Sequence, residues 1–195
     1  MTLAIFDFDK TISRSDSLID FIYHAVGPLW FTARFLCLSP ILILHLSGFI
    51  PNDRTKEIVL SFFFKNWDKP KFNAMALLYS QKHLPKIVRK KALEKIQWHQ
   101  SQGHQIVVVS ASLENYLNGW CRQIKADLLA TELEFKDGRF TGKLKSPNCK
   151  GQEKIRRLQA HYDLKKFSYI YAYGDSPSDL ALKTMANEFH YRSFE

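Results

Sequence analysis

The sequence predicts an α/β fold built on a doubly wound, mostly parallel sheet. Three short apolar segments, at residues 3–6, 105–110 and 169–173, have the composition of buried parallel strands. Helical patterns at residues 113–124 and 151–161 lie between the second and third of these segments. Alternation of strands with helices is typical of this fold class.

The composition is that of a globular protein with one domain, or with a core and an insertion. The chain has 195 residues, of which 46% are apolar and 24% charged, and this excludes a collagenous, low-complexity or mostly disordered protein. Three cysteines without a C-x-x-C pair argue against a disulfide scaffold or zinc ribbon and indicate a reducing compartment. The N-terminus lacks the regions of a signal peptide, so we expect a cytoplasmic location.

A large insertion is predicted between the first two strands. Roughly 95 residues separate them, whereas a βαβ unit needs only about 30. Within this interval, Ser15 and Asp16 form a helix-start signal, and helical pattern continues over residues 70–102. We therefore expect a helical cap at residues 13–90, inserted into a core of residues 1–12 and 91–195.

A β-hairpin is predicted between residues 130 and 144. Alternating segments flank Asp137 and Gly138, and an Asp-Gly pair in that position is a strong hairpin signal.

Residues 25–50 form an unusually apolar and aromatic stretch. Arg34, Pro40 and His45 interrupt it, so no charge-free run reaches the roughly 18 residues of a membrane-spanning helix. We expect buried helices here, and the alternative is a surface that touches a membrane or a lipid.

The chain is basic, with 28 Lys and Arg residues against 19 Asp and Glu residues, a formal charge of +9. Such a charge favours an anionic partner, which could be nucleic acid, a membrane surface or a phosphorylated substrate. Charge alone does not choose among these three.

Two acidic clusters follow predicted strands. Asp7 and Asp9 come after the first strand and, two residues apart in extended chain, can face one site. Asp175 and Asp179 come after the third strand, one helical turn apart. Ligands bind at this edge of such sheets, and crowded carboxylates need a cation such as Mg²⁺. The alternative for each pair is to cap the following helix.

Two further groups could bind a phosphoryl group. After the second strand, the hydroxyl of Ser110 and the backbone N–H groups of residues 110–112 could hold a phosphoryl oxygen. Lys150 opens the helix after the hairpin, and its ammonium could neutralise the carboxylates and the phosphate.

The ordered set of DFDKT, Ser110, Lys150 and GDSPSD resembles the haloacid dehalogenase superfamily. The large insertion after the first motif is similar to the helical cap of its phosphoserine-phosphatase-like branch. The resemblance covers essentially the whole chain. It implies a Rossmann-like core, Mg²⁺ as cofactor and a phosphomonoesterase that works through an aspartyl-phosphate.

The resemblance also implies residue roles. Asp7 would be the nucleophile and a metal ligand, and Asp9 the general acid and base whose backbone carbonyl binds the metal. Asp175 would be a metal ligand, and Asp179 a ligand or its support. The residues implied to bind the transferred phosphoryl group are Thr11, Ser110, Ala111 and Lys150.

The resemblance suggests two substrate classes. Asp16 stands nine positions after the nucleophile, where this branch carries an acidic substrate-binding residue. The apolar cap segment is a poor lining for phosphoserine and looks like the caps of lipid-phosphate phosphatases, such as those acting on phosphatidylglycerophosphate. Arg34 could meet a lipid headgroup there.

We therefore expect a lipid phosphate, with phosphoserine or another small metabolite as the alternative. A membrane-associated location and peripheral membrane contact are expected with it, and no nucleic-acid partner. The alternatives of a different class are a nucleic-acid-binding or membrane-binding protein without catalysis.

Overall fold

The computed structural model describes residues 1–195 and contains a five-stranded parallel sheet of order β3-β2-β1-β6-β7. The strands are β1 (Thr2–Phe6), β2 (Gln105–Leu113), β3 (Asp127–Thr131), β6 (Tyr169–Gly174) and β7 (Glu188–Tyr191). The three predicted strands form its centre, and the predicted fold class is confirmed. The edge strands β3 and β7 were not predicted, because both are short and only partly buried.

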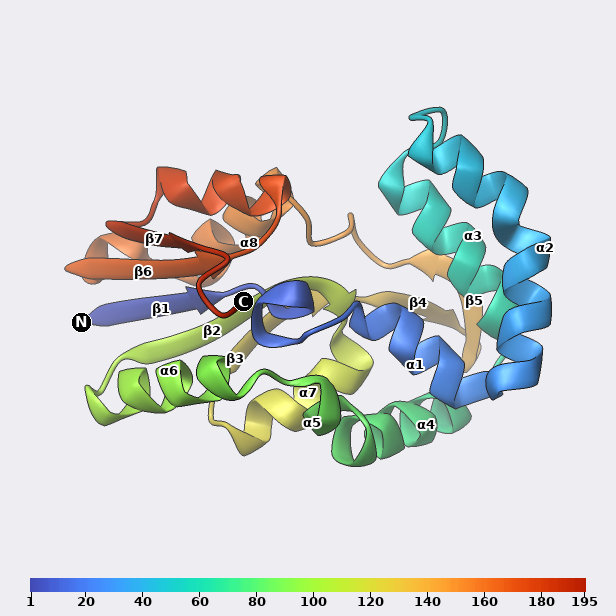
Figure 1. Cartoon of the computed structure of the whole chain (residues 1–195), viewed down its shortest axis with the longest axis horizontal. Helices are drawn as coiled ribbons and strands as arrows, with labels where there is room; N and C mark the ends of the chain where they lie inside the picture. The colour runs from blue at the N-terminus through green and yellow to red at the C-terminus, as the bar shows by residue number, and fades with distance from the viewer.

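Helices cover both faces of the sheet (Figure 1). The elements on one face are α6 (Lys90–Ser101) and α7 (Glu114–Gln123), and those on the other are α8 (Gln152–His161), η2 (Leu164–Lys166) and η3 (Pro177–Thr184). Side chains alternate along β1, so Leu3 and Ile5 join the smaller apolar cluster and Ala4 and Phe6 the larger one. The larger cluster continues from the sheet into the helical insertion.

The insertion lies beyond the carboxyl ends of the strands (Figure 1). Its helices are α1 (Ser17–Val26), α2 (Pro28–Leu46), α3 (Asn52–Phe64), α4 (Lys69–Lys82) and α5 (Leu84–Ile87). The predicted start of α1 is confirmed: the Asp16 carboxylate accepts hydrogen bonds from the backbone N–H groups of Leu18 and Ile19, both at 3.0 Å.

The predicted hairpin is present as β4 (Leu133–Lys136) and β5 (Arg139–Leu144). Asp137 and Gly138 both have positive φ, at 50° and 77°, as a tight hairpin turn requires. The hairpin forms hydrogen bonds with the insertion rather than with the sheet. The backbone N–H of Phe140, for example, donates to the carbonyl oxygen of Trp67 at 3.0 Å.

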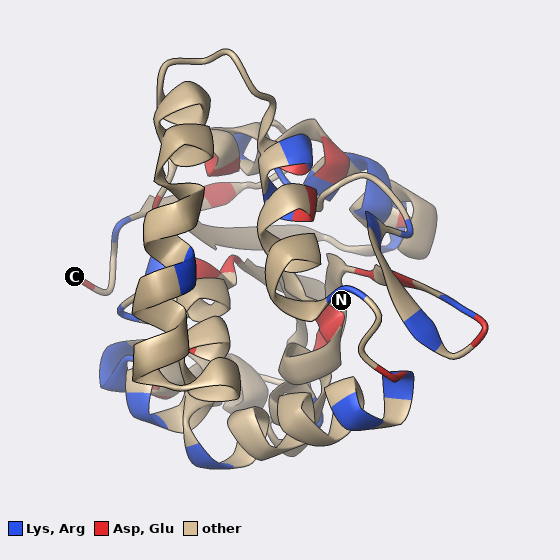
Figure 2. Ribbon diagram, turned by 90° about the vertical axis from the view of Figure 1, so that its right-hand side faces the viewer, with Lys and Arg blue, Asp and Glu red and all other residues tan.

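The prediction of buried helices at residues 25–50 is wrong for α2. Only Leu38 of this helix is buried. In an 18-residue window of the helix with mean hydropathy 1.7, 6% of the residues are buried. Apolar residues surround the whole helix, whereas α1 and α3 contact only part of its surface. By length and composition α2 could cross a membrane, since Arg34 is its one charged residue (Figure 2).

Candidate active site

The ends of β1 and β6 bring three aspartates together. One carboxylate oxygen from each of Asp7, Asp175 and Asp179 lies within 4.8 Å of the other two. The three residues are buried, with exposed fractions of 6%, 8% and 1%. Parallel strands end at one edge, so residues about 170 positions apart meet there, and their oxygen atoms are the ligands that Mg²⁺ prefers.

A buried lysine pairs with two of these aspartates. The Lys154 ammonium lies 2.5 Å from Asp7 Oδ1 and 2.6 Å from Asp179 Oδ1. The sequence predicted Lys150 in this role, but Lys150 is exposed and pairs with neither carboxylate. Lys154 follows Lys150 by one helical turn and shares the buried side of α8 with Ile155 and Leu158. That helical periodicity was the signal that could have identified it.

The carboxylates carry more negative charge than one lysine balances. Burial raises the pKa of Asp7 to about 7, although Lys154 acts in the opposite direction. Burial and the charge of Asp179 also raise the pKa of Asp175. For Asp179, burial is outweighed by Lys154 and the Ser176 hydrogen bonds, and its pKa is lowered. A divalent cation would stabilise the ionised forms, so these residues fit the predicted Mg²⁺.

The turn after β6 holds Asp179 in place. Its Oδ2 accepts hydrogen bonds from the backbone N–H and hydroxyl of Ser176, at 3.1 and 2.6 Å, in a capping box. A Cβ atom on Gly174 would lie 2.4 Å from the Asp179 Cβ, so glycine is required for this approach. Asp179 thus caps η3 with one oxygen and contacts Lys154 with the other.

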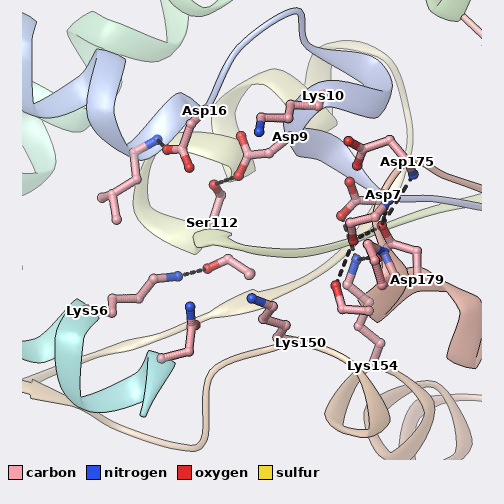
Figure 3. Close-up of a pocket in the computed structure, with 16 residues that line it drawn as sticks. Asp7, Asp9, Lys10, Asp16, Lys56, Ser112, Lys150, Lys154, Asp175 and Asp179 are labelled. Atoms are coloured by element: carbon pink, nitrogen blue, oxygen red, sulfur yellow. Dashed lines mark hydrogen bonds and ion pairs between the residues drawn. The ribbon is translucent and has the colours of Figure 1, made fainter. Parts of the chain in front are cut away.

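Asp9 lies beside this cluster, on the side toward Asp16 (Figure 3). Its carboxylate accepts hydrogen bonds from the backbone N–H of Ser17 at 2.8 Å and from the hydroxyl of Ser112 at 2.5 Å. Burial, followed by the charge of Asp16, raises the pKa of Asp9. A raised pKa favours the protonated carboxyl group that a general acid needs near neutral pH.

Some of the residues predicted to bind phosphate line the pocket, and others are buried and do not line it. Ala111 lines the pocket between these groups, whereas Thr11 and Ser110 are buried and do not line it. The Ser110 hydroxyl accepts a hydrogen bond from the backbone N–H of Ser112 at 3.0 Å. Ser112, which was not singled out as a site residue from the sequence, presents its side chain there. The Thr11 hydroxyl lies 3.5 Å from Asp175 Oδ1.

The pocket has a volume of about 550 Å³ and is strongly charged (Figure 3). Five aspartates and four lysines line it: Asp7, Asp9, Asp16, Asp175, Asp179, Lys10, Lys56, Lys150 and Lys154. The insertion contributes to the lining together with the core, and Asp16 belongs to that contribution.

Arg34 is not in the pocket, contrary to the expected substrate contact. Its guanidinium donates to the carbonyl oxygen of Phe63 at 3.5 Å and lies 5.8 Å from the ring centre of Trp30. The side chain lies against aromatic rings of α2 and α3.

Comparison with known proteins identifies the family. The model of the haloacid dehalogenase-like hydrolases matches residues 4–182. The chain belongs to this family. The hydrolase is 30% identical over 197 residues to protein CicA of Caulobacter vibrioides, covering 98% of this chain and 86% of CicA. It is 30% identical over 191 residues to a probable phosphatase of Mycobacterium tuberculosis, covering 93% of this chain and 65% of the relative.

Solved structures agree with the assignment of the fold. A Bordetella pertussis protein of unknown function superposes on the hydrolase with a TM-score of 0.79 and 19% identity, covering 96% and 88% of the chains. A phosphoserine phosphatase with a phospho-aspartyl intermediate analogue gives a TM-score of 0.67 at 19% identity, covering 96% and 84%. These findings confirm the predicted superfamily and phosphoserine-phosphatase-like fold, and support a phosphomonoesterase.

Proposed function

We propose that this hydrolase is a Mg²⁺-dependent phosphomonoesterase in which Asp7 forms an aspartyl-phosphate. The observation that carries the proposal is the convergence of Asp7, Asp175 and Asp179 beside Lys154, with Asp9 in the same pocket. The relative described as a probable phosphatase and the phosphatase structure with a phospho-aspartyl analogue support it.

The metal would be held by carboxylates that the fold already brings together. Asp7, Asp175 and Asp179 are its proposed ligands, together with the backbone carbonyl of Asp9. When bound, Mg²⁺ supplies positive charge against the phosphoryl oxygens.

The chain's own residues account for the proton and phosphoryl transfers. Lys154 holds Asp7 Oδ1, which leaves Oδ2 to attack phosphorus while the bond to the leaving oxygen breaks. Asp9 donates its proton to the leaving oxygen and then accepts one from the water that hydrolyses the aspartyl-phosphate. That second attack breaks the bond between Asp7 and phosphorus and regenerates the carboxylate.

The surrounding residues would hold and select the substrate. We place the phosphoryl group against the backbone at Ala111, with Ser110 orienting that backbone and Thr11 supporting Asp175. We assign to Lys154, instead of Lys150, the role of the lysine beside the nucleophile. Residues 13–90 would act as a cap that selects the leaving group, since Asp16 and Lys56 from this segment line the pocket.

The decisive experiment is the Asp7→Asn substitution, measured as turnover of p-nitrophenyl phosphate with Mg²⁺. We expect turnover to fall at least about 1,000-fold, because an amide is a far weaker nucleophile than a carboxylate. Thermal unfolding checks that the variant folds, and the exposed Asp163→Asn variant is the matched control. Wild-type turnover that survives both EDTA and this substitution contradicts the proposal.

A lipid phosphate is the substrate class that the exposed helix α2 favours. A helix that is apolar around its whole circumference is normally covered by protein or by lipid. Only 6% of the residues in the apolar window of α2 are buried, so protein does not cover most of its apolar surface. We infer that α2 contacts a membrane surface peripherally and gives the pocket access to a lipid phosphate.

Phosphoserine or another small metabolite phosphate is the alternative substrate, and Asp16 in the pocket lining would suit its amino group. Membership of a hydrolase family accounts for the acidic cluster, which neither a nucleic-acid-binding protein nor a non-catalytic membrane protein requires.

A further inference from the structure

Lys56 extends from the cap helix α3 into the pocket. Its ammonium donates hydrogen bonds to the carbonyl oxygen of Ala111 at 2.6 Å and to Asn148 Oδ1 at 2.8 Å. An ammonium group has three donors, so one N–H remains for a ligand. The Nζ atom of Lys56 faces the pocket across from Asp9 and Asp16 (Figure 3).

Asn148 joins α3 to the loop that carries Lys150. This residue is 3% exposed, and its side-chain amide donates to Asn52 Oδ1 at 2.8 Å. Its backbone N–H donates to an Asp53 carboxylate oxygen at 3.2 Å, and its Oδ1 also accepts from the hydroxyl of Thr131 at 2.8 Å. These bonds make α3 and the loop one wall of the pocket.

Lys150 lies on the same wall, two residues beyond Asn148. Its side chain lines the pocket and forms no ion pair, because Lys154 occupies the position between Asp7 and Asp179. Its Nζ atom also points into the space between the wall and the aspartates (Figure 3). The wall therefore presents two ammonium groups, neither of which the phosphoryl-transfer chemistry uses.

The charge of Lys150 acts on the buried ammonium of Lys56. Burial lowers the pKa of Lys56 to about 8; Asp9 and Asp16 favour its charged form, whereas Lys150 disfavours it. An anion bound between the two lysines would offset the repulsion between their charges and would accept hydrogen bonds from their free N–H groups.

We propose that Lys56 and Lys150 form a second anion-binding site, which binds a negatively charged group in the leaving portion of the substrate. This inference rests on the proposed phosphomonoesterase function and narrows its substrate class. The substrates are phosphate monoesters with a second anionic group, either a carboxylate or a phosphodiester, a few bonds from the transferred phosphoryl group. Simple alkyl phosphates lack that group.

The test is calorimetric binding of two phosphonates that cannot be hydrolysed, measured with Mg²⁺ present. 3-Phosphonopropionate carries the second anion and propylphosphonate does not. We expect wild-type protein to bind the first at least about 10-fold more tightly, since a charge-assisted hydrogen bond contributes roughly 10- to 100-fold. Lys56→Met and Lys150→Met should each reduce this preference about 10-fold, whereas the exposed hairpin variant Lys143→Met keeps it.

Equal binding of the two phosphonates overturns the proposal, as does a preference that survives both substitutions. If Lys56→Met fails to fold, Lys150→Met decides, because the Lys150 side chain is exposed and makes no hydrogen bond within the protein. Binding does not require turnover, so the Asp7→Asn experiment separately decides the proposed catalysis. Relative turnover of phosphoserine and a short-chain phosphatidylglycerophosphate then distinguishes a carboxylate from a phosphodiester as the natural second anion.

Discussion

Lys154 and Asp7, 147 residues apart in the chain, form a buried ion pair with 2.5 Å between Nζ and Oδ1. The same ammonium contacts Asp179, so α8 joins the ends of β1 and β6 through one side chain. The ammonium holds Asp7, the proposed nucleophile, and partly neutralises its charge. Because the pair is buried and also lines the pocket, we expect Lys154 to matter both for the stability of the core and for the proposed chemistry.

Removing this ammonium should destabilise the protein and inactivate it. In Lys154→Met, two buried carboxylates lose their partner, and breaking such a pair costs about 3–5 kcal/mol. Urea unfolding without Mg²⁺ measures this loss, and added Mg²⁺ should recover part of it. Lys150→Met is the matched control and should unfold like wild type, because Lys150 is exposed and unpaired. A greater loss of stability in the control would show that the two lysines have been assigned wrongly.

Mg²⁺ affinity should depend on pH through Asp7. The pKa of this carboxyl group is raised to about 7 in the metal-free protein, so it is increasingly protonated as pH falls below 7. A protonated carboxyl group binds Mg²⁺ poorly, and metal binding must then release the proton. Affinity should therefore rise about 5-fold between pH 6 and pH 7, about 10-fold in all by pH 8, and change little above pH 8.

Calorimetric titration of Mg²⁺ at pH 6, 7 and 8 measures this dependence. The Asp7→Asn variant should bind more weakly and show a shallower slope, because the titrating ligand is absent. Affinity that is constant from pH 6 to pH 8 in the wild type would exclude Asp7 as a titrating ligand.

Adding one methyl group at Gly174 should displace Asp179. The new Cβ atom in Gly174→Ala would lie 2.4 Å from the Asp179 Cβ, so η3 must move and the contact with Lys154 weakens. We expect a loss of about 1–3 kcal/mol in unfolding free energy and a fall in kcat/KM of at least about 10-fold. Gly119→Ala is the control, since its Cβ would also be crowded, 2.8 Å from Ser80 Oγ, but Gly119 does not line the pocket. Equal kcat/KM values for the two variants would contradict the assigned role.

Polar substitutions on α2 should abolish membrane binding and leave stability unchanged. Leu36, Ile43 and Leu46 are 68%, 61% and 85% exposed, so replacing all three with serine removes little buried apolar area. We expect wild-type protein to co-sediment with vesicles that contain anionic lipid, and the triple variant to lose at least about 10-fold in partitioning. Wild-type protein that stays in the supernatant would remove the support for a lipid substrate.

Local rules accounted for the elements that position the acidic residues. A β-strand followed directly by Asp7, another followed by Asp175 and a helix capped by Asp16 all depend on contacts between near neighbours. Asp137 and Gly138 define the hairpin turn for the same reason. The meeting of Asp7 with Asp175 also followed, because parallel strands end at one edge.

Contacts between distant segments determined which other side chains line the pocket. Ser110 and Ser112 have the same position in the strand alternation, but the pairing of β2 is irregular between Ser110 and Leu113, and only Ser112 lines the pocket. Asn148 gave no signal in the sequence, because its partner Lys56 lies 92 residues away.

Patterns in the sequence were enough to predict the α/β class, the family and the acidic residues at the strand ends, since these depend on short-range periodicity and on the common direction of parallel strands. The tertiary structure alone decided that Lys154 pairs with Asp7, that Lys56 and Lys150 share a wall, and that α2 is exposed. The reason is that burial is a property of the packed molecule: similar lysines, or similarly apolar helices, differ only in which neighbours cover them.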